Sequence, residues 1–577
     1  MSFSTKNKDL INKYIVPGNH AKSDYFSLIK ALVTEKNSCP TESIKREEWQ
    51  EEIAEVYELI HDELKTNQSK PVNTVKFGTS GWRGMIGKDL FVKSVALVTQ
   101  AIAEMYIEMP DSGEITEALG VGSLAEARTR GCVIGHDNRF GGPLLARTAC
   151  DILTANNFKV FYAGEASTGT LSATVLEKKA AFSINLTPSH NPLEYGGFKF
   201  NAADAGPAAS VITNKITANT KRLMQAAAIP TTPAKPELVT KIDALTCWQA
   251  FIRKGKKSHH LDYDEIIDRF ANRHDMVVAI DCVHGASRIH IDPLFKNMTN
   301  SRLIKLRAEK DYTFGGIAPE PSATNMKSVT AEINKRSEQL KLGVIIDPDA
   351  DRIRFTDGTI EIDMNQFGAM AYHFLHEIKK LTGLVAKNVA TSNFANKLAT
   401  SFNEEIFESR VGFKEFKPVI DRALVCFEES DGITIIGHTP EKDAYIGLML
   451  AMDMMLTLNK TLGQYLTELE ETYGRYYPAR DGITVSQQGD ELLSTLSALE
   501  KYKPGSSLMI GTEKRIIVSV IDIDGRKMIL DDGSWLMIRP SGTEPKIRFY
   551  VEARREHDKE HLFATARGML DEIGLLN

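Results

Sequence analysis

Several features that would direct an interpretation of this sequence are scarce or missing. Its 577 residues include only six cysteines, and these lack the close spacing of a zinc site or a disulfide framework. They stand mostly in apolar runs, which favours buried thiols in a reducing compartment. The polar start lacks the apolar core of a signal peptide, and the most apolar stretch, 445–458, is too short to span a bilayer. We therefore expect a cytoplasmic protein that does not bind a membrane.

The chain also lacks a strong excess of charge of either sign. Its 70 Lys and Arg against 76 Asp and Glu leave a formal charge of −6. This balance gives no general attraction to nucleic acid or to an anionic membrane. No nucleotide-binding loop of the Gly-x-x-x-x-Gly-Lys-Ser type is present, which argues against kinase chemistry. An anionic substrate would need local arginines and lysines.

The length points to several domains, because 577 residues exceed what one hydrophobic core normally supports. Strand-like and helix-like runs alternate along the chain, and this alternation is typical of α/β domains. We expect strands over 158–162, 181–185, 276–281, 342–346, 424–427, 516–521 and 535–538. We expect helices over 41–66, 144–157 and 445–458.

Three other segments carry more specific expectations. Apolar side chains recur at three- to five-residue steps from Ile44 to Leu64, which predicts an amphipathic packing helix with Thr41 as its cap. Residues 202–236, rich in Ala, Thr and Pro, are expected to close the first domain. Residues 253–260 are expected to form a charged connector with a solvated basic run.

The segment 186–192, Leu-Thr-Pro-Ser-His-Asn-Pro, follows an expected strand. Pro188 and Pro192 fix their own φ angles and push the residues before them out of the helical region, so the loop should be stiff. It would hold the Ser189 hydroxyl at a strand tip, as a nucleophile or a phosphoryl carrier requires. The alternative is an ordinary polar turn, because Pro, Ser and Asn are common turn residues.

Three carboxylates follow the apolar run 342–346: Asp347, Asp349 and Asp351. Pro348 is expected to hold this segment extended, so that alternate side chains share one side and converge. Carboxylates gathered in this way repel one another unless a cation lies among them, and ligands that are all oxygen favour Mg²⁺. Ca²⁺ is the second candidate, although the spacing is not that of a calcium loop. A solvated acidic turn is the remaining alternative.

Three further loops combine glycine or hydroxyl residues with charge. Segment 77–84, Phe-Gly-Thr-Ser-Gly-Trp-Arg-Gly, presents Arg83 from a tight backbone. Segment 427–432, Phe-Glu-Glu-Ser-Asp-Gly, offers a carboxylate and a hydroxyl that suit sugar hydroxyls. Segment 539–545, Arg-Pro-Ser-Gly-Thr-Glu-Pro, could cradle a phosphate with backbone amides, two hydroxyls and an arginine.

Residues 522–525, Asp-Ile-Asp-Gly, partly match the Asp-x-Asp-Gly-Thr motif of haloacid-dehalogenase phosphatases. Arg526 stands where that motif has threonine. A β-turn between two strands accounts for the segment better.

Taken in order, the loops at 186–192, 347–352, 427–432 and 539–545 resemble those of the α-D-phosphohexomutase family, the phosphoglucomutase and phosphomannomutase enzymes. The family's loops read Thr-x-Ser-His-Asn-Pro, Asp-x-Asp-x-Asp-Arg, Glu-x-Ser and Arg-x-Ser-Gly-Thr-Glu-Pro. With this resemblance, we expect three successive mixed-sheet α/β domains around a central cleft and a C-terminal phosphate-binding α+β domain. The expected parts are an N-terminal helical extension at 1–70 and domains at 71–255, 256–363, 364–474 and 475–577.

Carried over residue by residue, the resemblance implies four groups of site residues. The catalytic group is Ser189, Lys199, Arg83 and His190. The metal group is Ser189, Asp347, Asp349 and Asp351. The substrate-binding group is Arg352, Lys414, Glu428, Ser430 and Lys442. The phosphate-binding group is Arg539, Ser541, Gly542, Thr543 and Arg548.

Some of these roles are more detailed. The resemblance places Lys199 and Arg83 beside the serine, where like charge would lower the pKa of Lys199 and suit it to shuttle a proton. It makes His190 a residue that orients the serine loop. Asp137 and Arg139, in a Gly-x-Asp-x-Arg pattern of the family, are expected to brace the site and not to react.

The resemblance implies a phosphoglucomutase that interconverts glucose 1-phosphate and glucose 6-phosphate through phosphorylated Ser189. Mg²⁺ would be the cofactor, a sugar 1,6-bisphosphate the intermediate and activator, and a hexose phosphate the substrate. We expect a monomer or a homodimer. Phe427 and Asp431 depart from the family's usual Gly-Glu-x-Ser-Gly, so the alternatives are a phosphomannomutase or a dual-specificity hexose or pentose phosphomutase, with glucosamine phosphate a further possible substrate. A catalytically dead sugar-phosphate sensor would be expected to lack Ser189 or one of the aspartates.

Overall fold

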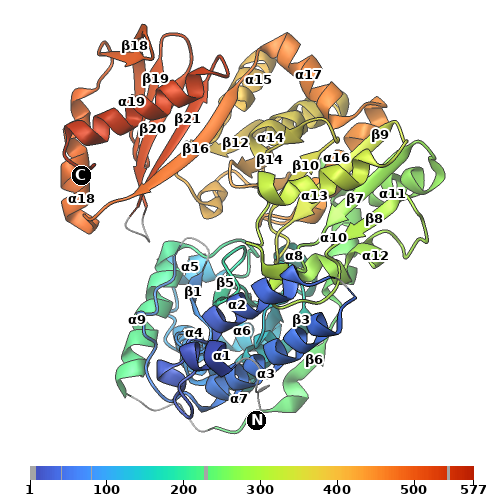
Figure 1. Cartoon of the computed structure of the whole chain (residues 1–577), viewed down its shortest axis with the longest axis vertical. Helices are drawn as coiled ribbons and strands as arrows, with labels where there is room; N and C mark the ends of the chain where they lie inside the picture. The colour runs from blue at the N-terminus through green and yellow to red at the C-terminus, as the bar shows by residue number, and fades with distance from the viewer. Residues whose placement is uncertain (1–7, 41, 79–80, 227–231, 542–545, 577) are drawn as a thin grey trace. The chain divides into compact units, whose positions relative to one another are not determined.

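The computed structural model describes residues 8–40, 42–78, 81–226, 232–541 and 546–576 (Figure 1). The chain forms two compact units, each of which is described by itself below. The first unit covers residues 1–257, 261–358 and 438–452, and the second covers 258–260, 359–437 and 453–577. Helix α16 (Ala444–Leu458), which the sequence predicts as a buried helix, begins in the first unit and ends in the second.

In the described part of the chain before the first sheet lie the α-helices α1 (Lys8–Tyr14), α2 (Tyr25–Ser38) and α3 (Ile44–Thr66). The apolar positions of α3 from Trp49 to Leu64 are buried, as its spacing predicts, and they join the core of the first sheet. Ile44 is an exception, because its side chain is 76% exposed. The expected cap, Thr41, lies outside the described residues. Ser43 caps the helix by accepting a hydrogen bond from the N–H of Arg46.

The first sheet is mixed and has the strand order β1-β5-β4-β2-β3-β6. Strands β4, β2, β3 and β6 pair in parallel, whereas β5 runs antiparallel to both β4 and β1. Its strands are β1 (Trp82–Met85), β2 (Cys132–His136), β3 (Val160–Glu165), β4 (Phe182–Leu186), β5 (Tyr195–Asn201) and β6 (Val239–Lys241). Its helices are α4 (Val92–Ile107), α5 (Glu114–Leu119), α6 (Leu124–Arg130), α7 (Gly142–Ala155), α8 (Thr168–Lys178), α9 (Ser210–Ala226) and α10 (Ala244–His259).

Helices occupy two segments of this region for which the sequence indicated none. Residues 202–236 include helix α9, whose buried face carries Ile212, Ile216 and Leu223 at helical spacing. The expected connector at 253–260 is instead mostly the last turns of α10. Its basic side chains are exposed, as predicted, and Arg253 pairs with Asp264 at 2.7 Å.

The strands of the second sheet that belong to the first unit have the order β10-β9-β7-β8. Strand β7 pairs in parallel with β8 and β9, and β10 is antiparallel to β9. The strands are β7 (Met276–Asp281), β8 (Leu303–Leu306), β9 (Leu340–Ile346) and β10 (Ile353–Thr356). The helices are α11 (Tyr263–Asn272), α12 (Ile291–Leu294) and α13 (Ala323–Asn334), of which α13 packs on β7 and β9.

The second unit contains a mixed sheet of order β13-β12-β14-β15, in which β12 is parallel to β13 and β14, and β15 is antiparallel to β14. Its strands are β12 (Leu384–Asn388), β13 (Ile406–Ser409), β14 (Ala423–Glu428) and β15 (Gly432–Ile435), and the short strand β11 (Glu361–Ile362) precedes them. Its helices are α14 (Met364–His373), α15 (Phe394–Phe402) and α17 (Leu462–Tyr473).

The last sheet is antiparallel throughout, with the order β16-β21-β20-β19-β18-β17 (Figure 1). Its strands are β16 (Tyr477–Thr484), β17 (Ser507–Ile510), β18 (Glu513–Ile521), β19 (Arg526–Leu530), β20 (Trp535–Pro540) and β21 (Lys546–Ala553). Helices α18 (Gly489–Leu496) and α19 (Asp558–Glu572) accompany it, and α19 packs on β20 and β21. Three mixed α/β sheets followed by an antiparallel sheet with helices confirm the predicted fold class.

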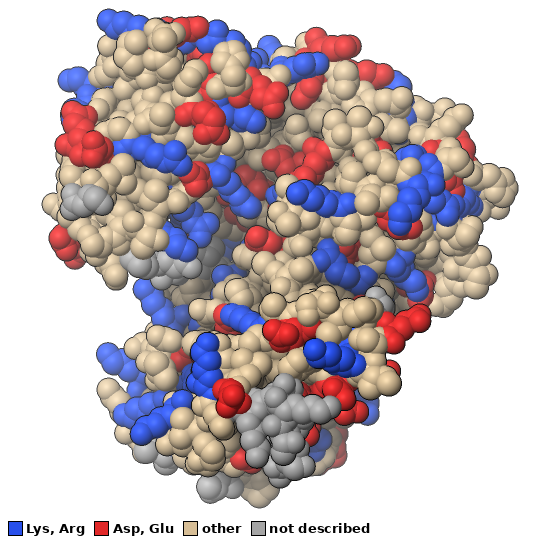
Figure 2. Space-filling model, viewed as in Figure 1, with Lys and Arg blue, Asp and Glu red and all other residues tan. Residues whose placement is uncertain are grey.

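Five of the six cysteines are buried, and Cys39 is half-buried; none forms a disulfide within the described chain. Basic and acidic side chains are interspersed over the face shown in Figure 2. Among the residues described, no helix combines the length and the apolar character needed to cross a membrane.

Candidate active site

The serine loop joins β4 to β5, at the tip of a buried strand. Ser189 adopts a left-handed backbone conformation, with φ of 60°, which an L-residue rarely adopts without support from its surroundings. The hydroxyl of Thr187 provides part of that support, because it accepts the Ser189 N–H at 2.9 Å and donates to Asp137 at 2.7 Å. These hydrogen bonds fix the conformation of the loop, which is therefore not a freely solvated turn.

Arg139 holds the same loop from its carbonyl side. Its guanidinium donates to the carbonyl oxygens of Ser189 at 2.8 Å and Pro192 at 2.6 Å, and also to that of Asn191. The Arg139 side chain is itself buried over Phe314, with its guanidinium carbon 4.9 Å from the ring centroid. These contacts agree with the expectation that Asp137 and Arg139 brace the site.

Strand β5 approaches the serine loop more closely than a side chain would allow. A Cβ added at Gly197 would lie 2.2 Å from the carbonyl oxygen of Thr187. The register pairs Gly197 with Arg83 of β1, so the arginine predicted from the 77–84 loop stands on the strand next to the one that carries Lys199. Thr79 and Ser80 of that loop lie outside the described residues.

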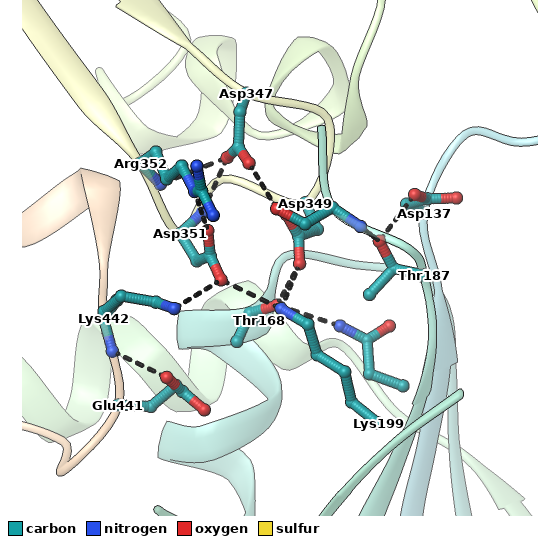
Figure 3. Close-up of polar contacts among 12 residues, drawn as sticks. Asp137, Thr168, Thr187, Lys199, Asp347, Asp349, Asp351, Arg352, Glu441 and Lys442 are labelled. Atoms are coloured by element: carbon teal, nitrogen blue, oxygen red, sulfur yellow. Dashed lines mark hydrogen bonds and ion pairs between the residues drawn. The ribbon is translucent and has the colours of Figure 1, made fainter. Parts of the chain in front are cut away.

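The three aspartates converge, but not in the predicted way. Residues 347–351 form a turn and not an extended segment, with Ala350 left-handed at φ 51° and its N–H bonded to the carbonyl of Asp347. One oxygen of Asp347 accepts the N–H groups of Asp351 and Arg352, which closes the turn (Figure 3). Carboxylate oxygens of all three aspartates lie within 4.8 Å of one another, and all three residues are buried.

This aspartate cluster contacts Lys199 and Lys442 (Figure 3) as well as the serine. The Ser189 hydroxyl donates to Asp347 at 2.9 Å. Lys199 donates to Asp349 at 2.6 Å and to Asp351 at 2.9 Å, and Lys442 lies 3.3 Å from Asp351. Arg352 pairs with Asp351 at 3.6 Å. Residues predicted separately as catalytic, metal-binding and substrate-binding thus meet in one place within the first unit.

The charges of the cluster shift its pKa values in different directions. Burial and repulsion by the other two aspartates raise the pKa of Asp347 well above its ordinary value. Burial alone would raise the pKa of Asp351, but Lys199, Lys442 and Arg352 lower it well below its ordinary value.

The predicted lowering of the Lys199 pKa is wrong for this arrangement. Burial would lower that pKa, but Asp349 and Asp351 outweigh burial and raise it. The prediction considered only the like charge of Arg83 and missed the two carboxylates that Lys199 contacts.

His190 lies beside the serine, with its Nδ1 atom 3.4 Å from the Ser189 hydroxyl oxygen. The positive charge of Arg352, then burial, then Arg83 lower the pKa of His190 well below its ordinary value. The imidazole is therefore neutral near pH 7. A neutral ring fits a role in orienting the serine better than a role that needs a charged ring.

Thr168 and Asn185 belong to this site, although the motifs did not indicate them. Thr168, at the start of α8, donates its hydroxyl to Asp349 at 2.8 Å and its N–H to the carbonyl of the same residue. The Asn185 amide donates to the Thr168 hydroxyl at 3.0 Å. The signal in the sequence was a Ser-Thr-Gly-Thr segment after the β3 strand, which resembles any helix cap until the fold places it beside the aspartates.

The donor set of the cluster suits a hard divalent cation. Within the described residues, Oδ1 of Asp349 and Oδ1 of Asp351 are buried and accept no hydrogen bond, although Nε of Arg352 lies 3.6 Å from Oδ1 of Asp351. Buried carboxylate oxygens without donors are costly unless a cation compensates them. Six- to eight-oxygen or octahedral coordination by such groups is typical of Ca²⁺ and Mg²⁺.

In the second unit, the sugar loop predicted at 427–432 begins at the end of strand β14. Glu428 is buried and accepts the N–H of Gly412 at 2.9 Å and the amide of Asn388 at 3.2 Å. Lys414 lies on the one-turn helix η7 (Phe413–Phe416) directly after Gly412, and Ser430 follows Glu428 in a half-buried position. The structure therefore brings the 411–414 loop to the sugar loop.

The predicted phosphate loop leaves the last sheet of the second unit. Arg539 of β20 faces Arg548 of β21 in the strand register, and Arg539 donates to Asp524 at 2.8 Å. Ser541 pairs with Lys546 through its backbone N–H. Gly542 and Thr543 lie outside the described residues. The DxDG segment forms the turn between β18 and β19, as predicted.

Models of four successive domains of the phosphoglucomutase/phosphomannomutase family match this chain. Domains I, II and III match residues 74–227, 251–360 and 363–473, and the C-terminal domain matches 493–567. The resemblance inferred from the four loops is confirmed by these matches.

Individual relatives carry names for different sugars. A probable phosphoglucosamine mutase of Methanopyrus kandleri is 27% identical over 492 residues, which cover 84% of this chain and 95% of the relative. A cytoplasmic phosphoglucomutase of Mesembryanthemum crystallinum is 26% identical over 560 residues, which cover 84% of this chain and 91% of the relative. The crystal structure of a putative phosphomannomutase from Thermus thermophilus has a TM-score of 0.67 and is 23% identical in sequence. The match covers 86% of this chain and 99% of that protein.

All four family domains are present in the family's order, on the fold of its solved members. The chain belongs to the α-D-phosphohexomutase family and is an enzyme, an intramolecular phosphotransferase of the isomerase class.

Proposed function

We propose that this enzyme is a phosphoglucomutase, which interconverts glucose 1-phosphate and glucose 6-phosphate through phosphorylated Ser189 and glucose 1,6-bisphosphate. The observation that carries the proposal is the hydrogen bond of 2.9 Å from the Ser189 hydroxyl to Asp347 of the buried aspartate cluster. A hydroxyl held on a braced loop against a cation site is the arrangement that a phosphoryl carrier needs.

The serine oxygen is the group that exchanges the phosphoryl. In the forward half-reaction the bond from Ser189 Oγ to phosphorus breaks while a sugar hydroxyl oxygen bonds to the same phosphorus, and the proton of that hydroxyl passes through a base to Ser189 Oγ. The bisphosphate then reorients. Ser189 Oγ bonds to the other phosphorus while the bond from that phosphorus to the sugar oxygen breaks, the serine proton passes to that sugar oxygen, and the phosphoserine is restored. The exchange needs no nucleotide, in agreement with the missing nucleotide-binding loop.

We assign the cation to Asp347, Asp349, Asp351 and the phosphate on Ser189. Mg²⁺ bound there would supply positive charge to the phosphoryl group during transfer. Lys199 contacts Asp349 and Asp351, so we assign to it the neutralisation of these carboxylates and contact with the transferred group. Arg83 supplies further positive charge on the neighbouring strand, and His190 orients the serine.

The remaining assignments concern substrate recognition. We assign the sugar hydroxyls to Glu428 and Ser430, and substrate phosphate or sugar contacts to Arg352, Lys414 and Lys442. The phosphate that does not react is assigned to the last sheet, because a cradle of backbone amides and arginines binds either end of the sugar equally. The residues of this cradle are Arg539, Ser541, Gly542, Thr543 and Arg548.

The alternative is a phosphomannomutase or a dual-specificity hexose or pentose phosphomutase. Two observations favour keeping it. The relatives are named for glucosamine, glucose and mannose phosphates at similar identity, and Phe427 and Asp431 flank the sugar loop where the family usually has glycine.

A cytoplasmic location is proposed from the relatives named as cytoplasmic, and a monomer or homodimer is proposed with it. The domain boundaries after residues 70, 255, 363 and 474 and the central cleft are likewise proposals.

Turnover of glucose 1-phosphate, mannose 1-phosphate, glucosamine 1-phosphate and ribose 1-phosphate tests the assignment. Each substrate is run with Mg²⁺ and a trace of its bisphosphate. The proposal predicts a strong preference for glucose 1-phosphate. Equal rates on glucose and mannose phosphates would replace it with dual specificity, and turnover of only the pentose or amino-sugar phosphate would overturn it.

A further inference from the structure

Asp524 joins two parts of the second unit that the motifs describe separately. Its Oδ2 atom accepts a hydrogen bond from Arg539 Nε at 2.8 Å and another from the backbone N–H of Val411 at 2.9 Å. Arg539 opens the predicted phosphate loop, and Val411 opens the loop that leads to Lys414. One carboxylate oxygen therefore bridges the last sheet and the preceding α/β domain.

The turn that carries Asp524 is fitted closely to Arg539. Gly525 has a φ of 86°, and a Cβ there would lie 2.6 Å from the carbonyl oxygen of Ile538 and 2.9 Å from the Cα of Arg539. Only glycine allows this approach at that backbone conformation. The turn thus fixes the direction of the Arg539 side chain through both its backbone and the Asp524 carboxylate.

The contacts continue from Val411 to the sugar loop. The next residue, Gly412, donates its N–H to Glu428 at 2.9 Å, and Asn388 donates its amide to the same oxygen at 3.2 Å. Val411 also packs against the apolar cluster that joins the two sheets, made of Val389, Ala390, Trp535, Met537 and Tyr550. A continuous path of direct contacts runs from Arg539 through Asp524 and the 411–412 backbone to Glu428.

We propose that Asp524 is a positioning residue that holds the phosphate-binding Arg539 in place relative to the sugar-binding Glu428. A ligand that contacts both Arg539 and Glu428 would then depend on Asp524 more than a ligand that contacts Arg539 alone. This inference rests on the proposed function for the roles of Arg539 and Glu428. It gives the DxDG segment a task unrelated to the phosphatase motif that it resembles.

Other contacts keep the two sheets together, so removal of the Asp524 carboxylate is not expected to separate them. Lys527, fully buried, donates to the carbonyl of Val389 at 2.9 Å. Glu552 accepts the N–H of Asn393 at 3.1 Å and the indole N–H of Trp535 at 2.8 Å. A variant at Asp524 should therefore report on alignment and not on folding.

Asp522 offers a matched control in the same turn. It pairs with Arg526 at 2.9 Å, its side chain is 57% exposed, and it is placed in neither the catalytic nor the binding groups. D524A, D524N and D522N would be made in a Ser189→Ala background and in the parent enzyme. Calorimetry on the Ser189→Ala proteins measures binding of glucose 6-phosphate, mannose 6-phosphate and inorganic phosphate, and the parent enzymes give kcat and KM.

The account predicts that D524A weakens glucose 6-phosphate binding about tenfold, the loss expected for charge-assisted hydrogen bonds. D524N, whose carbonyl oxygen can still accept both hydrogen bonds but carries no charge, should fall between D524A and the parent. Inorganic phosphate, which has no sugar to align, should change by less than about twofold, because Arg539 itself is kept. D522N should match the parent in every measurement, and thermal unfolding should be the same for D522N and D524N.

A further comparison tests the path to the sugar. Glu428→Gln combined with D524A should lose less binding than the sum of the two single losses, because both changes break the same alignment. Additive losses would contradict the inference. So would equal losses for inorganic phosphate and the hexose phosphates, or a D524A that behaves as D522N does.

Failure of the proposed function gives a different pattern. An enzyme that binds a hexose 6-phosphate with the predicted D524A effect but turns over no hexose phosphate would refute the mutase assignment and leave the role of Asp524 intact. An enzyme that turns over hexose phosphates without that effect would refute only the role of Asp524. Absence of binding to either hexose phosphate would refute both.

Discussion

The Ser189 hydroxyl donates a hydrogen bond to Asp347 at 2.9 Å, although 158 residues separate the two in the sequence. The serine comes from the loop between β4 and β5, and the aspartate follows β9 of the next sheet. Their meeting depends on the packing of two sheets within the first unit. It joins the proposed phosphoryl carrier to the proposed cation site.

The aspartate cluster should bind Mg²⁺, and Asp351→Asn should weaken that binding. A cation that binds only the folded protein stabilises it by an amount that grows with the logarithm of its concentration over its dissociation constant, so the parent should show a rise in Tm with Mg²⁺ that the variant loses. We expect a Mg²⁺ dissociation constant at least about tenfold higher in the variant. Calorimetry and thermal unfolding with and without Mg²⁺ measure both effects.

Asp264→Asn is a suitable control for this experiment, because Asp264 is a half-exposed aspartate paired with Arg253 on the surface of the same unit. It should leave the Mg²⁺ dissociation constant unchanged. An Asp351→Asn enzyme that binds Mg²⁺ as the parent does would contradict the proposed cation site.

Thr187→Val should impair the serine loop while keeping the shape of the side chain. The change removes the hydroxyl that links the Ser189 N–H to Asp137, and each buried group left unpaired costs about 1–3 kcal/mol. We expect kcat to fall about tenfold or more, because the serine oxygen is no longer held in place. Thr148→Val, whose hydroxyl bonds to the Leu144 carbonyl within α7, should be close to neutral. The prediction fails if both variants keep full kcat.

Two Gly-to-Ala substitutions should have opposite effects on stability. Gly197→Ala places a Cβ where only 2.2 Å separates it from the Thr187 carbonyl oxygen, so β5 or the serine loop must move. Gly568→Ala meets open space within α19 and should stabilise the protein by about 0.5–1 kcal/mol, because alanine favours helix. Chemical denaturation measures both changes. Equal stability of the two variants would contradict the close approach of β5 to the serine loop.

Stability should fall in mild acid, partly because of His290. Burial lowers the pKa of this residue to about 4, and the ring lies 2.8 Å from the Tyr445 hydroxyl. A histidine with a lowered pKa in the folded state stabilises the protein fully above its unfolded pKa of about 6.5, and this contribution is lost as the pH falls toward 4. The loss for His290 is about 3 kcal/mol by this linkage.

The free energy of unfolding of the parent and of His290→Gln, measured from pH 8 to pH 4, checks this prediction. The parent should lose more stability over that range than the variant, which has no group that titrates at this position. Parallel curves for the two proteins would show that His290 does not titrate as described.

The sequence indicates most of this site because its chemistry depends on short local motifs. The Ser189 loop and the three aspartates each follow a strand, and the strands at 276–281, 342–346 and 424–427 agree closely with β7, β9 and β14. Apolar runs between turn residues identify such strands directly. Their alternation with helices indicated α/β domains, whereas the arrangement in four domains was expected from the resemblance of the four loops to the family.

The contacts between motifs were harder to predict. The segment that begins at Asp347 was expected to be extended, because Pro348 restricts its own φ. That restriction does not prevent the left-handed conformation of Ala350, which follows in the turn. The pKa of Lys199 was expected to fall, but it is raised in the structure. Sequence spacing does not show which of several charged groups Lys199 contacts. Thr168 carries no motif of its own, and its place beside Asp349 depends on tertiary packing.

The most direct test of the account is the identity of the phosphoryl carrier. The parent and Ser189→Ala enzymes are incubated with glucose 1,6-bisphosphate and Mg²⁺, the modified residue is located by mass spectrometry, and the turnover of glucose 1-phosphate is measured on the same samples. The account predicts phosphate on Ser189 of the parent, none in the variant, and loss of turnover with it. A Ser189→Ala enzyme that still converts glucose 1-phosphate at the parent rate would contradict the central claim.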